Sequence, residues 1–231
     1  MSIGSLFSGV GGLELGLERA GLGPVRWQVE IEPFCRRVLA RHWPEAVRHD
    51  DVRNVGADDL DPVDVMCGGF PCQDISSANR GRGDGLDGPK SGLWYEYLRI
   101  IEAVGPRVVV IENVAKWRAW LPDVRRGLWG LGYAAVPIRL CASEVGAPHH
   151  RARVFVVAYA DEDTESACAL HAEASRVFGL SRPDGHWRTP PPGGWRVDDG
   201  TPDGMDRGRA CGNAVVPQCA EVIGRLIVAA A

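Results

Sequence analysis

Short apolar runs alternate along the chain with longer segments in which apolar residues recur every three or four positions. The apolar runs predict buried strands at Ile3–Phe7, Val25–Val29, a short stretch from Val47, Val63–Met66, Val108–Ile111, Ala134–Leu140 and Val154–Val157. The periodic segments predict helices at Leu13–Ala20, Pro33–His42, Leu93–Val104, Val124–Leu131 and Cys219–Ala230. Buried strands alternating with helices are typical of an α/β fold with a mostly parallel sheet, which is the class that we expect.

A glycine-rich turn, Ser8-Gly9-Val10-Gly11-Gly12, joins the first strand to the first helix. Strand, glycine turn and helix open a nucleotide-binding unit, because glycines let the backbone approach a ligand and a helix N-terminus offers free N–H groups. The spacing is not the Gly-x-Gly-x-x-Gly of dinucleotide sites, and a plain tight turn explains such a loop equally well.

Two acidic residues follow the next two strands. Glu30 ends the second strand about 20 residues beyond the glycine turn, where a carboxylate can hold ribose hydroxyl groups. Asp51 follows the third strand and could accept a hydrogen bond from an adenine amino group. A solvated strand-end carboxylate is the plainer explanation of each, and the glycine turn favours the ribose role for Glu30.

The fourth strand leads into Cys67-Gly68-Gly69-Phe70-Pro71-Cys72-Gln73-Asp74-Ile75-Ser76. Glycines and proline break the strand into a loop at the end where an α/β fold holds its chemistry. Cys72 is therefore a candidate nucleophile, although most buried free cysteines are inert. Cys67 lies within the apolar run and reads as a core residue. The glycine-rich, basic stretch from Ser76 to Lys90 has no apolar period, and a loop of that length is usually either functional or disordered. Next to a candidate nucleophile, the more specific interpretation is a lid that closes over a substrate.

Charged residues also flank the later strands. Glu112 comes directly after Val108–Ile111 and is expected beside Cys72 in a parallel sheet, as a general acid whose pKa burial raises. Arg151 and Arg153 alternate with Ala152 at a strand start and can point the same way, although two exposed edge arginines would be the simpler reading. Periodicity then collapses from Ala160 to Arg209, which predicts a small irregular lobe before the last helix.

Composition narrows the possibilities further. The 231 residues, 45% hydrophobic and 24% charged, suffice for one α/β core. No stretch is long and apolar enough for a membrane span, and Met1 runs straight into a strand, so we expect neither a membrane segment nor a signal peptide. Seven cysteines without a CxxC pair favour reduced thiols in a cytoplasm and no structural zinc site. The net charge is −4. Of the 26 basic residues, only Lys90 and Lys116 are lysine. The excess of arginine is explained either by contacts with phosphates or by the codon usage of a GC-rich genome.

Taken together, these motifs resemble the cytosine-specific (carbon 5) DNA methyltransferases, particularly the small phage and prophage forms. The chain carries Phe7-Ser8-Gly9-Val10-Gly11-Gly12, Gly69-Phe70-Pro71-Cys72-Gln73, Glu112-Asn113-Val114, Arg151-Ala152-Arg153 and Gly212-Asn213-Ala214-Val215, in the family's order. The resemblance covers Ile3 to Val157 and Arg209 to the end, and it implies a Rossmann-like, S-adenosylmethionine-dependent fold.

Roles follow from the resemblance residue by residue. The catalytic group would be Cys72, Glu112, Arg151 and Arg153. S-adenosylmethionine, which leaves as S-adenosylhomocysteine, would be held without any metal by Phe7, Ser8, Gly9, Gly11, Gly12, Leu13, Glu30, Ile31, Asp51, Val52, Pro71, Asn213 and Ala214. A thiolate adding at carbon 6 activates carbon 5 of cytosine toward the methyl group, and the cytosine must first leave the duplex.

The resemblance implies three parts: residues 1–159 for catalysis, 160–209 for target recognition and 210–231 for a helix that returns to the catalytic domain. The family usually has a larger recognition domain than the interval from Ala160 to Arg209 provides. We expect a monomeric, cytoplasmic enzyme of a bacterial or phage-infected cell, acting on double-stranded DNA and not on a membrane. An inactive cofactor- or DNA-binding remnant and an RNA cytosine methyltransferase remain the alternatives.

Overall fold

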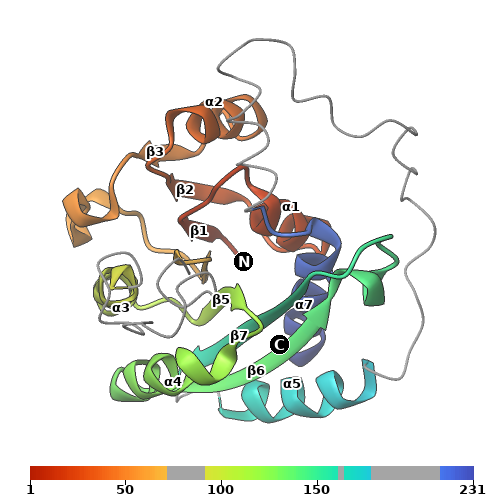
Figure 1. Ribbon diagram of the computed structural model, residues 1–231. Coiled ribbons are helices and arrows are strands. Elements are labelled where there is room, and N and C mark those ends of the chain that lie inside the picture. Colours follow the sequence, from red (N-terminus) through yellow and green to blue (C-terminus); the bar gives the residue numbers. More distant parts are fainter. Residues whose placement is uncertain (72–91, 161–163, 178–213) are drawn as a thin grey trace.

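The computed structural model describes residues 1–71, 92–160, 164–177 and 214–231. Its centre is a sheet in the order β3-β2-β1-β4-β5-β7-β6 (Figure 1). The strands are β1 (Ile3–Leu6), β2 (Val25–Val29), β3 (Val47–His49), β4 (Val65–Gly68), β5 (Val108–Val114), β6 (Tyr133–Cys141) and β7 (Ala152–Ala160). All neighbouring pairs are parallel except β5 with β7 and β6 with β7, which confirms the mostly parallel α/β fold.

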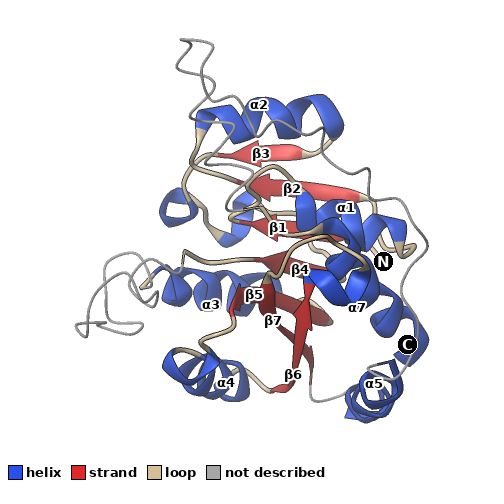
Figure 2. Cartoon of the chain, turned by 45° about the vertical axis from the view of Figure 1, so that its right-hand side comes forward, coloured by secondary structure: helices blue, strands red, loops and turns tan. Residues whose placement is uncertain are grey.

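Helices cover both faces of this sheet (Figure 2). They are α1 (Gly12–Arg19), α2 (Pro33–His42), α3 (Leu93–Val104), α4 (Leu121–Gly130), α5 (Thr164–Val177) and α7 (Pro217–Ala230). Short 3₁₀ turns are η1 (Val52–Asn54), η2 (Ala57–Asp59), η4 (Trp117–Ala119) and η5 (Ala142–Val145). None of the helices in the described ranges has the length and apolar character needed to cross a membrane.

Alternation along the central strands divides the core into two clusters. In β5, Val109 and Ile111 pack with the side chains of α3 and α4, whereas Val108 and Val110 pack with those of α1, α5 and α7. All four side chains are 0–1% exposed. A strand that buries both faces has no polar positions to alternate, which is why its sequence is a continuous apolar run.

The helix expectations were met most closely where local signals were strong. The bounds of α2 and α3 are those expected, with Pro33 in the first turn of α2 and Gly105, at φ 60°, just after α3. α4 begins three residues before the expected Val124, at Leu121, because Pro122 occupies the first turn and Leu121 is buried. β5 continues through Glu112 to Val114 because β7 pairs with it over that whole length.

The expected irregular lobe from Ala160 to Arg209 is wrong for its first part. Residues 164–177 form α5, which packs on β6, β7 and α7. Its buried stripe is Ala167, Leu170 and Ala174, a helical spacing built mostly from alanine and therefore weak as a hydrophobic signal. The rest of that segment, the expected lid, the expected nucleophile Cys72 and the expected cofactor ligand Asn213 lie outside the described residues.

Candidate active site

The glycine turn curls between β1 and α1 with three residues in the left-handed region. These are Phe7 at φ 55°, Gly9 at φ 57° and Gly11 at φ 82°. A Cβ added at Gly9 would meet nothing within 4 Å, so there is open space beside that part of the backbone. A Cβ at Gly11 would stand 2.3 Å from the ring of Trp43, so the other side of the turn is closed by packing. The turn therefore offers one open face.

Glu30 braces this turn from the end of β2. Its Oε2 accepts a hydrogen bond from the Gly9 N–H at 2.7 Å, and its Oε1 accepts one from the Glu32 N–H at 2.9 Å. The side chain is 8% exposed, whereas neighbouring Ile31 is 57% exposed. Each carboxylate oxygen has a second lone pair, so Glu30 can position the turn and still accept from a ligand hydroxyl.

Three other residues expected around the turn are buried and support it. Ser8 donates from its hydroxyl to Ser5 Oγ at 2.9 Å and is buried. Leu13 and Val52 are each 4% exposed and belong to the two core clusters, so they support the surrounding backbone from beneath.

Asp51 has a partner that the sequence did not indicate. Its Oδ1 accepts a hydrogen bond from the backbone N–H of Arg53 at 3.0 Å, and this bond caps the start of η1. Its Oδ2 forms an ion pair with Arg53 Nη2 at 2.5 Å. The side-chain hydrogen bond from Arg53 is the main reason that the pKa of Asp51 is lowered. Asp51 is therefore a fixed, ionised hydrogen-bond acceptor, and it lies at the same edge of the sheet as Glu30.

The C-terminal segment returns to the glycine turn, as expected for the last motif. A Cβ at Gly12 would stand 2.3 Å from the carbonyl oxygen of Val215, and one at Gly16 would stand 2.3 Å from that of Pro217. The backbone at the start of α7 thus lies directly on α1.

Glu112 and Arg153 form an ion pair across β5 and β7, with Glu112 Oε1 and Arg153 Nε 2.8 Å apart. A Cβ added at Gly69 would stand 2.9 Å from Glu112 Oε2, so this carboxyl lies against the loop that leads through Pro71 to Cys72. Burial raises the pKa of Glu112, and the charges of Arg153 and Arg151 oppose that rise without cancelling it. The direction agrees with the expected general acid.

Asn113 holds the same loop from the next position along β5. Its Nδ2 donates to the carbonyl oxygen of Phe70 at 3.2 Å, and its Oδ1 accepts from the Val114 N–H at 2.7 Å. Asn113 is 2% exposed. It was absent from the expected site set, although it stands inside the Glu-Asn-Val motif that could have drawn attention to it.

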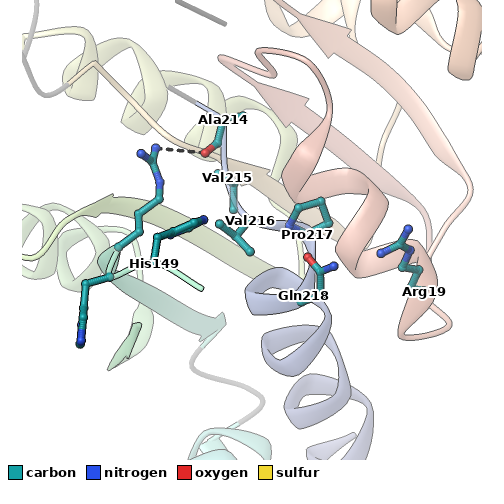
Figure 3. Close-up of a pocket in the computed structure, with 9 residues that line it drawn as sticks. Arg19, His149, Ala214, Val215, Val216, Pro217 and Gln218 are labelled. Carbon is teal, nitrogen blue, oxygen red and sulfur yellow. Dashed lines mark hydrogen bonds between the residues drawn. The ribbon is translucent and has the colours of Figure 1, made fainter. Parts of the chain in front are cut away.

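Arg151 connects the strand arginines to the C-terminal segment. Its Nη2 donates to the carbonyl oxygen of Ala214 at 3.0 Å, the dashed contact in Figure 3. A pocket of about 560 Å³ opens beside this contact, lined by Arg19, His149, His150, Arg151, Ala214, Val215, Val216, Pro217 and Gln218. The structure thus joins Arg151 and Ala214, which the motifs had placed in separate groups.

Comparisons with known proteins identify the family that this chain resembles. The family model for C-5 cytosine-specific DNA methylase matches residues 1–182. Type II methyltransferase M2.BsuMI of Bacillus subtilis is 35% identical over 175 residues, which are 71% of this chain and 43% of that protein. Type II methyltransferase M.Bsp6I of a Bacillus species is 37% identical over 115 residues, 49% of this chain and 36% of that protein.

A crystal structure shows the same likeness in three dimensions. A prophage-encoded protein of E. coli, named as a DNA modification methyltransferase, superposes with a TM-score of 0.57 at 29% identity. The match covers 70% of this chain and 47% of that one. The chain spans less than half the length of each of these relatives.

Proposed function

The chain belongs to the C-5 cytosine-specific DNA methylase family, and we propose that it transfers a methyl group from S-adenosylmethionine to carbon 5 of a cytosine in double-stranded DNA. One observation carries the proposal most directly. The Glu112 carboxyl, paired with Arg153, lies against Gly69 of the loop that continues to Cys72. The glycine turn lies on the same edge of the parallel sheet, where α/β folds bind their ligands.

The residues around the glycine turn fit S-adenosylmethionine. Gly9 leaves open space where a side chain would stand, Glu30 presents a carboxylate beside it, and Ile31 exposes an apolar side chain. An adenosine needs these features: close backbone approach, an acceptor for ribose hydroxyls and an apolar contact for the base. When bound, this cofactor supplies an electrophilic methyl group on a sulfonium.

We propose that Cys72 supplies the nucleophile. Its thiolate adds to carbon 6 of cytosine, so that a carbon–sulfur bond forms and the ring electrons move toward nitrogen 3 and carbon 5. Glu112, whose pKa burial raises, donates a proton or a strong hydrogen bond to nitrogen 3. Carbon 5 then takes the methyl group and loses its proton to a base, and the carbon–sulfur bond breaks to restore the thiolate.

The arginines orient the substrate in this scheme. Arg153, held by Glu112, hydrogen-bonds the cytosine carbonyl oxygen. Arg151, held by the Ala214 carbonyl oxygen, ties the catalytic edge to the segment beside the cofactor turn. Because carbon 6 is inaccessible within a duplex, the target cytosine must flip out of the helix.

Target recognition is assigned to residues 178–209 rather than to the whole interval from 160. The first part of that interval, α5, buries Leu170 in the core cluster, which supports grouping it with the catalytic domain. We further propose that the chain acts as a monomer in the cytoplasm of a bacterial or phage-infected cell, with DNA methylation of the restriction–modification type.

Trapping of a covalent complex tests the proposal. DNA containing 5-fluorocytosine blocks the last step, because fluorine replaces the carbon 5 proton, and should leave the enzyme attached to DNA. We expect a denaturant-stable complex that requires S-adenosylmethionine and disappears in Cys72→Ser. Trapping on the matching RNA alone would favour the RNA alternative. No trapping on either polymer, with cofactor binding intact, would favour the inactive remnant.

A further inference from the structure

A cysteine with polar partners, Cys141, lies at the end of β6. Cys141 Sγ is 3.4 Å from Nδ1 of His150 and accepts a hydrogen bond from the Ser143 hydroxyl at 3.2 Å. The backbone N–H of Cys141 donates to the Glu144 carboxylate, which fixes the start of η5. A thiol held between a hydroxyl donor and an imidazole differs from a cysteine packed only among apolar side chains.

The surroundings of Cys141 favour its thiolate. Burial acts to raise the pKa, but the hydrogen bonds from Ser143, Arg151 and His150 outweigh it and lower the pKa of Cys141 to about 7. Two other buried cysteines behave in the opposite way. Burial raises the pKa of Cys67, and it raises that of Cys219 to about 12. Of these three buried thiols, Cys141 is the one whose surroundings favour ionisation near neutral pH.

We propose that Cys141 is a reactive thiol at which small disulfides and soft electrophiles modify the chain. With glutathione disulfide, the Cys141 thiolate attacks one sulfur, a new disulfide bond forms, and the original bond breaks. The released glutathione thiolate takes a proton from water. His150 can accept the thiol proton at Nδ1 when its tautomer carries the hydrogen on Nε2.

Access to the sulfur depends on His150. Cys141 is only 4% exposed, whereas the His150 ring lies at the surface and lines the pocket beside Arg151. An adduct on Sγ cannot fit in the 3.4 Å between sulfur and Nδ1, so the ring must swing aside. Modification at Cys141 therefore displaces the residue directly before Arg151.

That displacement reaches a contact which the proposed function uses. The Ala142 N–H donates to the carbonyl oxygen of Arg151 at 3.1 Å, and the guanidinium of Arg151 donates to Ala214 at 3.0 Å. Shifting His150 and Arg151 should loosen Ala214 beside the glycine turn. The adduct is therefore expected to weaken S-adenosylhomocysteine binding, and this second part of the inference rests on the proposed cofactor site.

Thiol labelling tests the first part without reference to methyl transfer. Initial rates of iodoacetamide labelling are measured on the full native chain from pH 5.5 to 9.5, with each cysteine peptide quantified by mass spectrometry. Cys141 should reach half its limiting rate near pH 7, against about 8.5 for an ordinary thiol. Exposed Cys168 of α5 provides the reference for an accessible cysteine. His150→Ala should move the Cys141 midpoint upward. A midpoint above 8, or labelling only after unfolding, would overturn the proposal.

Glutathione disulfide then tests the coupling. The starting protein is Cys72→Ser/Cys168→Ser, so that neither the proposed nucleophile nor the exposed Cys168 reacts. One glutathionyl group on the Cys141 peptide, with at least a fivefold loss of S-adenosylhomocysteine affinity that dithiothreitol reverses, is the expected result. Adding Cys141→Ser should abolish both changes. An adduct at Cys141 with unchanged affinity would overturn the coupling, and binding that is absent before treatment would instead count against the proposed cofactor site.

Discussion

The carbonyl oxygen of Val215 occupies the space into which any side chain at Gly12 would extend, only 2.3 Å from the position of a Cβ. The first helix and the last segment of the chain are therefore fitted to each other at the cofactor turn. The obstacle is backbone, which cannot rotate away as a side chain would. Position 12 therefore requires glycine because a side chain would clash with Val215, and not because the backbone adopts an unusual conformation.

Gly12→Ala should consequently push the Val215 segment off α1. We expect a loss of about 1–3 kcal/mol in the free energy of unfolding, as for other overpacked sites, and weaker S-adenosylhomocysteine binding. Urea unfolding and calorimetric titration measure the two effects. Gly130→Ala is the matched control, because a Cβ at the end of α4 meets nothing within 4 Å. Equal behaviour of the two variants would refute the steric reading.

Replacing Glu112 by Gln removes the proton that we assign to cytosine nitrogen 3. The single-turnover methylation rate should fall by about 100-fold or more, within the range for loss of a general acid. Because burial raises the folded-state pKa of Glu112, the neutral form persists below that pKa and is lost as pH rises through it. The wild-type rate should therefore decline as the pH rises through the pKa of Glu112, and the Gln variant should lack that decline. A methylation rate of Glu112→Gln within threefold of the wild-type rate would exclude this role. Glu221→Gln on α7 is the control and should keep the wild-type rate.

The two arginines should differ in the kinetic constant that they affect. Arg151→Lys shortens the reach to the Ala214 carbonyl oxygen and should raise KM for S-adenosylmethionine more than it changes kcat. Arg153→Lys keeps a charge near Glu112 but loses the fixed fork, so kcat should fall instead. Steady-state kinetics with saturating DNA distinguishes them. The reverse pattern would contradict the assignment of Arg151 to the cofactor side.

Glu14 predicts a pH dependence of stability. It is 0% exposed among Ser5, Ser8, Gln28 and Cys67, its Oε2 has no hydrogen-bond partner, and burial raises its pKa. An acid with a raised folded-state pKa costs stability above its unfolded pKa of about 4.3, progressively up to the folded value. Glu14→Gln should thus be more stable than wild type at pH 8, and the gain should vanish toward pH 4. Urea unfolding at both values measures it, and a gain independent of pH would show that Glu14 is ionised in the fold.

Local signals predicted those elements whose pattern is complete within a few residues. The apolar run of β2 and the proline-started period of α2 gave both sets of bounds correctly. α5 was not predicted because its buried positions Ala167 and Ala174 are only weakly hydrophobic. Leu170 is the one large apolar side chain of the three that α5 packs against the sheet. Small side chains such as alanine can be buried without producing a clear hydrophobic period in the sequence.

The same division applies to the site. Motif order placed Glu112 and Arg153 in one group, and their ion pair brings them together. No pattern predicted that Arg53 would pair with Asp51, or that His150 would lie against Cys141. Such contacts depend on where loop backbones turn, and the composition of these loops does not specify that.

Genome-wide bisulfite sequencing measures the proposed activity most directly. The chain and its Cys72→Ser form are expressed separately in a bacterial host that lacks cytosine methylation. We predict methylated cytosines with the first and none with the second, and a shared sequence around them would give the target of residues 178–209. Unmethylated DNA in both strains, with the protein folded and binding S-adenosylmethionine, would contradict the proposal that this chain is a working DNA cytosine methyltransferase.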